Sequence, residues 1–106
     1  MFRHIYRRRE KNDITIKELT EMVNKLENVI LLDVRSPEEH AEGHLKHSMN
    51  LPLYEIEKRI AKVVPDFNTV IIVYCKGGKR SRRAMEILQQ KGYSNLYNLA
   101  GGLEGI

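Results

Sequence analysis

The sequence predicts an α/β domain, in which a small parallel sheet of four or five strands carries helices on both faces. Two observations predict this class. Short apolar runs rich in β-branched residues alternate along the chain with amphipathic stretches, and the connections between them are short. Such alternation favours parallel strands joined by crossover helices. At 106 residues, the chain is long enough for one domain with a single modest core.

The first helix is marked by its start signal. Thr15 and Glu18 have the spacing of a capping box, and apolar residues then recur on one helical face at Ile16, Leu19, Val23 and Leu26. We expect a brief edge strand just before this helix, within residues 14–16. Residues 28–34 contain a nearly continuous apolar run, which is typical of a strand covered on both faces.

A second capping box starts a short helix. Ser36 is its N-cap, Pro37 stands at the first helical position, Glu39 completes the box, and Gly43 ends the helix. Residues 49–51 then predict a brief strand that Pro52 stops.

The second half of the chain repeats the alternation. From Leu53 a helix presents one apolar face and pairs Glu55 with Arg59 on its outer side; the apolar positions are Ile56, Ile60, Val63 and Val64. A buried strand is expected over residues 70–74, a helix over 81–91 that ends at Gly92, and a last strand over 95–99. A short stub after Gly101 and Gly102 completes the chain.

The charge is unevenly placed. Residues 1–11 carry five basic side chains against one acid, which accounts for the whole formal net charge of +4. We therefore expect residues 1–12 to be a basic lead-in, residues 13–106 to be the single domain, and no face that binds nucleic acid. The alternative is that the lead-in touches a membrane surface or an acidic partner.

No apolar run reaches membrane-spanning length, so we expect no integral membrane association. The single cysteine excludes an internal disulfide and favours a reducing, cytoplasmic setting.

That cysteine opens the stretch on which a functional interpretation depends. It follows the strand at 70–74 and begins a loop that leads into a helix, Cys75-Lys76-Gly77-Gly78-Lys79-Arg80-Ser81. Both glycines accept positive φ, so that successive N–H groups can curl into an anion-binding nest. The helix start and five cations at positions 76, 79, 80, 82 and 83 should lower the pKa of the thiol. We expect a solvent-facing nucleophile; the alternative is a small buried hydrophobe.

Several segments together resemble the rhodanese, or sulfurtransferase, domain family. They are Leu32-Asp33-Val34-Arg35, Pro37-Glu38-Glu39, Gly43-His44, Asn50-Leu51-Pro52, the Cys-x-x-Gly-x-Arg-Ser loop at Cys75 to Ser81, and Leu99-Ala100-Gly101-Gly102. The resemblance implies a parallel sheet with helices on both faces and transfer of a sulfane sulfur through a persulfide on Cys75. It also implies that the N–H groups of residues 76–80 cradle the persulfide and that Arg80 closes the loop.

The chemistry expected from these residues is a two-step transfer that needs no cofactor. The Cys75 thiolate would take the outer sulfur of thiosulfate or a persulfide, while Lys76, Lys79 and Arg80 attract the anionic donor. Cyanide, glutathione or a protein thiol would then remove the sulfur, which gives ping-pong kinetics. The acceptor must come from outside, because the chain has no second cysteine.

The chain departs from the family pattern at three places. Lys76 stands where arginine is common, and His47-Ser48 replaces Gly-Ala, which predicts a stiffer or differently shaped loop. The usual tryptophan and closing helix after the double glycine are absent, so we expect the C-terminal cover of the core to be missing or supplied by a partner.

Other polar residues near the site have two interpretations. Asp33 and Arg35 end a strand on the side of the cysteine loop, where they would support its amides or form an ion pair that pins neighbouring loops. His40, His44 and His47 have spacings compatible with a metal site, but Gly43 interrupts the helix, so we expect no zinc. His44 should bond to nearby backbone, and His40 and His47 should be surface groups.

Two further function classes are open. A cysteine phosphatase uses a Cys-x5-Arg loop, but position 81 is serine and Arg80 comes one residue too early. A regulatory docking module, or a dedicated carrier of persulfide sulfur, would share the fold without turning over small donors. The cysteine and the basic loop favour the enzyme.

Overall fold

The computed structural model describes residues 11–106 and contains a wholly parallel sheet of five strands in the order β1-β5-β4-β2-β3. The strands are β1 (Asp13–Ile14), β2 (Ile30–Asp33), β3 (Met49–Asn50), β4 (Ile71–Tyr74) and β5 (Leu96–Leu99). The helices are α1 (Ile16–Lys25), α2 (Pro37–Glu42), α3 (Leu53–Val63), α4 (Lys79–Gln90) and the 3₁₀ helix η2 (Gly102–Gly105). The predicted α/β class is confirmed. Apart from residues 11 and 12, the predicted basic lead-in lies outside the described residues.

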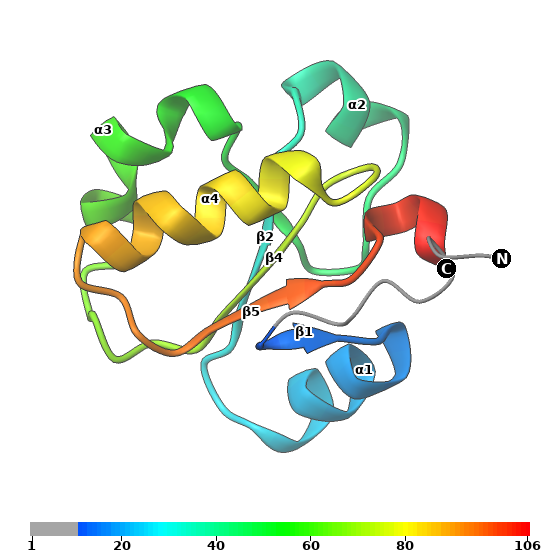
Figure 1. The fold of residues 1–106 in the computed structure, drawn as a ribbon, viewed down its shortest axis with the longest axis horizontal. Helices are drawn as coiled ribbons and strands as arrows, with labels where there is room; N and C mark the ends of the chain where they lie inside the picture. Colours follow the sequence, from blue (N-terminus) through cyan, green and yellow to red (C-terminus); the bar gives the residue numbers. More distant parts are fainter. Residues whose placement is uncertain (1–10) are drawn as a thin grey trace, which may run out of the picture.

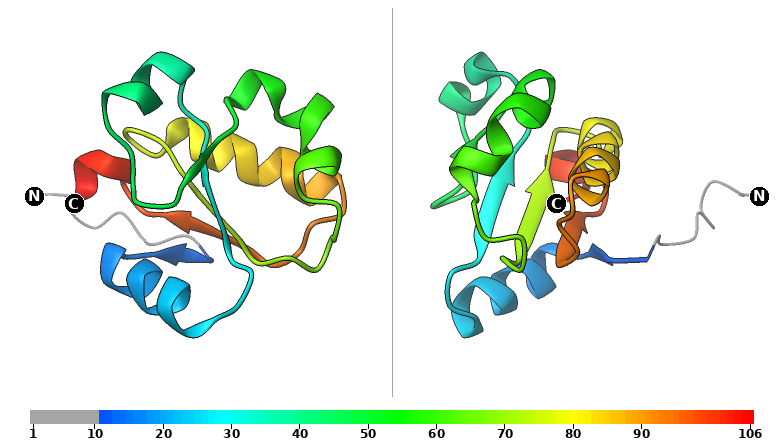
Figure 2. Two further views of the ribbon diagram at one scale, coloured as in Figure 1. Left: turned by 180° about the vertical axis from the view of Figure 1, so that it is seen from behind. Right: turned by 90° about the vertical axis from the view of Figure 1, so that its left-hand side faces the viewer.

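Helices cover both faces of the sheet, as predicted. Helix α1 lies on one face, and α3 and α4 lie together on the other (Figures 1 and 2). The central strand β4 serves both layers, because successive side chains of a strand point to opposite faces. Ile71 and Val73 join the core under α3 and α4, whereas Ile72 and Tyr74 join the core under α1.

Both predicted capping boxes are present. In α1 the Glu18 amide donates to Thr15 Oγ1 at 3.1 Å, and the Thr15 amide donates to Glu18 Oε1 at 2.8 Å. In α2 the Glu39 amide donates to Ser36 Oγ at 3.1 Å, and the Ser36 amide donates to Glu39 Oε1 at 3.0 Å. Each box pairs amides that the first turn of a helix leaves without partners. The sequence therefore predicts where these two helices begin.

Several predicted boundaries shift by one or two residues. The edge strand before α1 is Asp13–Ile14, because Thr15 is already the N-cap of the helix. Helix α4 begins at Lys79 and not at residue 81, since Gly78, with φ of 106°, forms its N-cap. As a result, two basic residues of the cysteine loop belong to the first turn of α4.

The predicted C-terminal stub is instead the short helix η2, which follows β5 (red in Figure 1). Gly101 and Gly102 turn the chain with φ of 74° and 62°, values that favour glycine. Leu103 then packs against the core on the α1 side. The prediction of a missing C-terminal cover is wrong, because η2 supplies a short one. No helix within residues 11–106 has the length and apolar character needed to cross a membrane.

Candidate active site

The site lies at the carboxyl edge of the sheet. Because all five strands are parallel, the residues that follow β2, β4 and β5 reach the same edge. Cys75 follows β4, the middle strand of the five, and η2 follows the neighbouring β5. This is the edge at which open α/β sheets bind ligands.

Cys75 is buried, with 1% of its surface exposed, so the prediction of a solvent-facing thiol is wrong. The reason is the alternation of β4. Cys75 continues the series of Ile71 and Val73, whose side chains face α3 and α4, and it belongs to the same core cluster. The sulfur therefore lies beneath the loop that it begins.

The loop holds the sulfur with backbone amides. The Gly78 amide donates to Cys75 Sγ at 3.0 Å, and the Ser81 amide does so at 3.4 Å. Sγ also lies 3.4 Å from Ser81 Oγ, to which the thiol donates, and that hydroxyl donates to the Gly78 carbonyl at 3.1 Å. Ser81 is fully buried. The first turn of α4 is thus directed at the sulfur, an arrangement that favours negative charge there.

The two loop glycines have different roles. Gly78 has a positive φ, as predicted, but Gly77 does not, so the prediction is wrong for Gly77. A Cβ at Gly77 would lie 3.2 Å from Glu104 Oε1. Gly78 therefore serves the backbone conformation, whereas a Cβ at Gly77 would crowd only the end of the exposed Glu104 side chain.

Of the predicted loop cations, Arg80 does not present a free charge. Its two terminal nitrogens donate to the Glu39 carboxylate at 2.7 and 3.0 Å, which joins α4 to α2. These hydrogen bonds lower the pKa of Glu39 to about 2 and raise that of Arg80. The expectation that Arg80 attracts the donor is therefore corrected: its contacts suit holding the loop closed.

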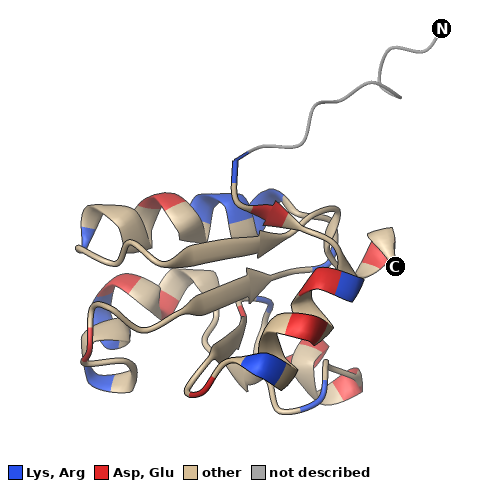
Figure 3. Cartoon of the chain, turned by 90° about the horizontal axis from the view of Figure 1, so that it is seen from below, with Lys and Arg blue, Asp and Glu red and all other residues tan. Residues whose placement is uncertain are grey.

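The remaining cations divide into paired and unpaired groups. Arg82 pairs with Asp13 at 3.1 Å, where the acidic position of β1 lies beside the basic part of α4 (Figure 3), and Arg83 pairs with Glu86 at 2.8 Å. Lys76 and Lys79, by contrast, form no ion pair with any side chain among residues 11–106. These two lysines are the charges left for a ligand.

A cavity of about 470 Å³ opens at the cysteine loop; its lining residues are Cys75, Lys76, Gly77, Lys79, Arg80 and Glu104. Helix η2 forms part of its wall, since the amides of Leu103 and Glu104 each donate at 2.9 Å to the carbonyls of Cys75 and Lys76. Sequence reasoning missed Glu104. The available signal was that a strand parallel to and beside β4 must deliver its following residues next to the cysteine loop.

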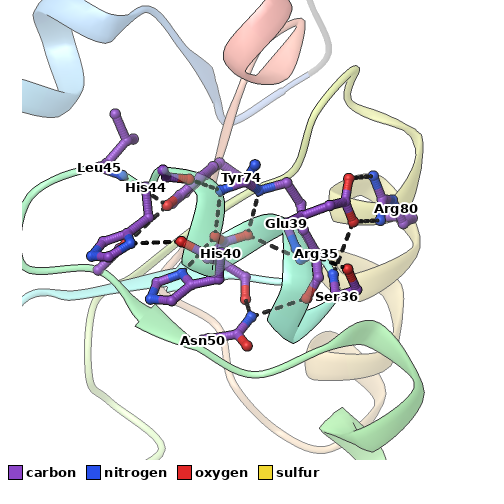
Figure 4. A network of polar contacts seen from close by, with 12 residues as sticks. Arg35, Ser36, Glu39, His40, His44, Leu45, Asn50, Tyr74 and Arg80 are labelled. Atoms are coloured by element: carbon purple, nitrogen blue, oxygen red, sulfur yellow. Dashed lines mark hydrogen bonds and ion pairs between the residues drawn. The ribbon is translucent and has the colours of Figure 1, made fainter.

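Asp33 and Arg35 form a buried ion pair, and Figure 4 shows the network around Arg35. Asp33 Oδ1 accepts from Arg35 Nε at 2.9 Å and Oδ2 from Nη2 at 2.8 Å, and Nη2 also donates to the Gly43 carbonyl at 2.6 Å. Burial raises the pKa of Asp33, but hydrogen bonds from Arg35 and His40 outweigh it and leave the pKa below its ordinary value. These contacts fit the interpretation of a pair that pins the loop after α2.

Hydrogen bonds also hold two of the histidines, His40 and His44, and the serine of the His47-Ser48 pair. His44 Nδ1 donates to the His40 carbonyl at 2.8 Å, as predicted, and the two rings stack with centroids 3.8 Å apart. The prediction that His40 is a surface group is wrong, because its Nδ1 lies 2.8 Å from buried Asp33 Oδ2.

The loop that contains His47 and Ser48 is joined to β4. Ser48 Oγ forms a hydrogen bond with Tyr74 Oη at 2.8 Å. Residues 11–106 hold no group of three potential metal ligands.

Comparison with known proteins identifies the family. The model of the rhodanese-like domain matches residues 15–106. The chain belongs to the rhodanese-like domain family. It is 45% identical over 75 residues to thiosulfate sulfurtransferase PspE of Escherichia coli, covering 71% of each protein, and 34% identical over 92 residues to a sulfurtransferase of Allochromatium vinosum, covering 87% of this chain and 84% of that one.

The rhodanese-like fold is equally clear from solved structures. The human single-domain sulfurtransferase TSTD1 superimposes with a TM-score of 0.76 at 25% identity, covering 88% of this chain and 92% of that chain. The family, the fold and the transferase class predicted from the sequence are thereby confirmed.

Proposed function

We propose that this rhodanese-like domain moves a sulfane sulfur from thiosulfate or a persulfide to a thiol or cyanide through a persulfide on Cys75. The observation that carries the proposal is the position of Cys75 Sγ. It receives the Gly78 and Ser81 amides, and Cys75 is one of the residues that line a cavity with Lys76 and Lys79, which form no ion pair within residues 11–106. The names of the relatives, among them a thiosulfate sulfurtransferase, support the same donor.

In the first step the Cys75 thiolate attacks the outer sulfur of thiosulfate. A new S–S bond forms to Cys75, the S–S bond of thiosulfate breaks, and the electron pair leaves with sulfite. The products are a persulfide anion and the sulfite dianion, so atoms and charge balance. Lys76 and Lys79 draw the dianion into the cavity and stabilise departing sulfite, because charges in a partly enclosed site are screened less than in water.

In the second step an acceptor attacks the outer sulfur of the persulfide. Cyanide leaves as thiocyanate and restores the thiolate, whereas a thiol leaves as a new persulfide. No electron is gained or lost by the protein over the cycle, so the reaction requires no redox cofactor. A protein thiol is an acceptor of the same class, and the reduced thiols that it requires suit a cytoplasmic setting.

The other site residues position this chemistry. Amides of residues 76–80 would cradle the outer sulfur, with Gly78 and Ser81 already bonded to Sγ. Arg80, held by Glu39, closes the loop, and Asp33 with Arg35 supports the neighbouring segment. The two steps as written use neither a metal nor nucleic acid.

Two alternatives are less well supported. A phosphatase would need a free guanidinium to bind the phosphoryl group, but Arg80 is occupied by Glu39 and position 81 is a buried serine. A docking module would have no use for a loop that combines a held thiol with two unpaired lysines. A dedicated sulfur carrier would share all these features and differ in its acceptor.

Steady-state kinetics test the proposal. Thiocyanate formation is measured while thiosulfate and cyanide are varied together. We expect parallel double-reciprocal lines, the signature of a covalent intermediate, and no activity in Cys75→Ala. Retained activity in that variant, or hydrolysis of an aryl phosphate that depends on Cys75, would contradict the mechanism. Slow turnover with cyanide but rapid transfer to a protein thiol would assign the carrier role.

A further inference from the structure

One acidic side chain, Glu104, lines the cavity beside Cys75. It lies in η2, after the double glycine, and its amide donates to the Lys76 carbonyl at 2.9 Å. This bond anchors the backbone of Glu104 to the cysteine loop. Its carboxylate reaches back over Gly77, where a Cβ would approach Oε1 to 3.2 Å. A negative charge thus lies at the wall of a site that the loop otherwise makes positive.

The Glu104 carboxylate is not neutralised by its surroundings. It forms no ion pair with any basic side chain of residues 11–106, unlike Glu39 and Glu86, whose charges are cancelled by arginines. The cavity therefore presents two unpaired lysines and one unpaired carboxylate around the thiol. A dianion entering it meets attraction from the lysines and repulsion from Glu104, and the repulsion grows with the charge of the donor.

We propose that Glu104 determines donor specificity: it disfavours small dianions such as thiosulfate and favours persulfides whose carrier group is neutral or cationic. This inference rests on the proposed sulfurtransferase function. The step for such a donor is balanced. The Cys75 thiolate attacks the outer sulfur of R–S–SH, the S–S bond breaks, R–S⁻ leaves with the electron pair, and the proton stays on the Cys75 persulfide. A neutral R group brings no charge for Glu104 to repel.

The test compares donors in the wild type and in Glu104→Gln, which keeps the shape and removes the charge. The donors are thiosulfate, the persulfide of N-acetylcysteine methyl ester, whose carrier is neutral, and the persulfide of cysteamine, whose carrier is cationic. Glu21→Gln, a change at an exposed residue of α1 that does not line the cavity, is the matched control for net charge. The quantity followed is kcat/KM for sulfur uptake, at low and at high salt.

In Glu104→Gln we expect kcat/KM for thiosulfate to rise roughly two- to fivefold relative to the neutral persulfide at low salt. For the cationic persulfide, kcat/KM relative to the neutral persulfide should fall by a similar factor. Added salt should reduce both changes. Glu21→Gln should leave the ratios at their wild-type values. Glu104→Lys should shift them further in the same direction.

Unchanged donor ratios in Glu104→Gln would overturn the inference. So would an equal loss with all three donors, since that would mean that Glu104 only supports the loop. Failure of the proposed function looks different: the wild type itself would take sulfur from none of the donors.

Discussion

At the scale of single residues, Cys75 is both the expected nucleophile and part of the core. Its side chain is 1% exposed, and with residues 71 and 73 it faces α3 and α4. The amides of Gly78 and Ser81 donate to its sulfur. The loop composition suggested an exposed thiol, but counting alternate positions from the buried strand into the following loop would have placed this side chain in the core.

Burial also changes what the Cys75→Ala variant should do. We expect it to abolish sulfur transfer, because the nucleophile is gone. We also expect a free energy of unfolding about 1 kcal/mol lower than the wild type, since a small buried group is removed from the core. Urea denaturation measures the second effect. Wild-type stability would indicate an exposed thiol, and residual transfer would exclude Cys75 as the acceptor of the sulfur.

Gly102 is the residue that lets η2 approach the cysteine loop. Its φ is 62°, and a Cβ there would lie 2.5 Å from the Cys75 carbonyl oxygen and 2.6 Å from that of Lys76. Gly102→Ala should therefore lower the free energy of unfolding by about 1–3 kcal/mol and reduce kcat/KM, because the loop must move. Denaturation and thiocyanate assays measure the two effects.

The control is Ser94→Ala, a change at an exposed residue between α4 and β5 that brings no atom toward the cysteine loop. We expect little change in either quantity. Comparable losses in both variants would show that the close contact between η2 and the loop is unimportant.

At the scale of elements, local signals were read correctly and contacts between distant segments were not. Both capping boxes lie within four residues, so their spacing reveals them. The pair between Glu39 and Arg80 joins residues 41 positions apart, and nothing in the sequence indicates it. Glu39 serves twice, since the same carboxylate that caps α2 also holds the first turn of α4.

The pair between Glu39 and Arg80 predicts a pH dependence of stability. The pKa of Glu39 falls from 4.5 in the unfolded chain to about 2 in the fold, so the pair stabilises above pH 4.5. Its contribution is lost as the pH falls from 4.5 through 2. Because Glu39 is 28% and Arg80 38% exposed, solvent screening limits the contribution to about 1 kcal/mol.

Glu39→Gln tests the charge of Glu39, to which both Arg80 and the Ser36 amide respond, because glutamine can keep the capping hydrogen bond and loses the charge. At neutral pH we expect the variant to be about 1 kcal/mol less stable than the wild type, with the gap closing toward pH 2. Glu38→Gln, the exposed neighbour on α2, should show no gap. A difference that stays constant with pH would mean that the charge of Glu39 contributes nothing. Urea unfolding over this pH range makes the comparison.

At the scale of the whole molecule, alternation and short connections were sufficient to predict the parallel sheet and its two helical layers. These sequence patterns do not specify the strand order. The edge strands β1 and β3 are only two residues long, so where each begins and ends depends on its pairing with the neighbouring strand. The C-terminal helix η2 was missed for a related reason. Two glycines suggest a turn, and only contact with the cysteine loop makes the following residues helical.

The same arrangement explains how a chain of this size builds a site. Parallel strands deliver the cysteine loop and η2 to one edge, and each completes the wall of the cavity that the other begins. Within residues 11–106, the charges without an ion-pair partner at this edge are on Lys76, Lys79 and Glu104, and we propose that they select the donor.

The most direct test of the account is the intact mass of the protein after incubation with thiosulfate, before and after cyanide is added. The account predicts a gain of one sulfur atom on Cys75, reversed by cyanide as thiocyanate forms, and no gain in Cys75→Ala. A folded wild-type protein that gains no sulfur from thiosulfate or from a persulfide would contradict it, and the docking-module interpretation would then be preferred.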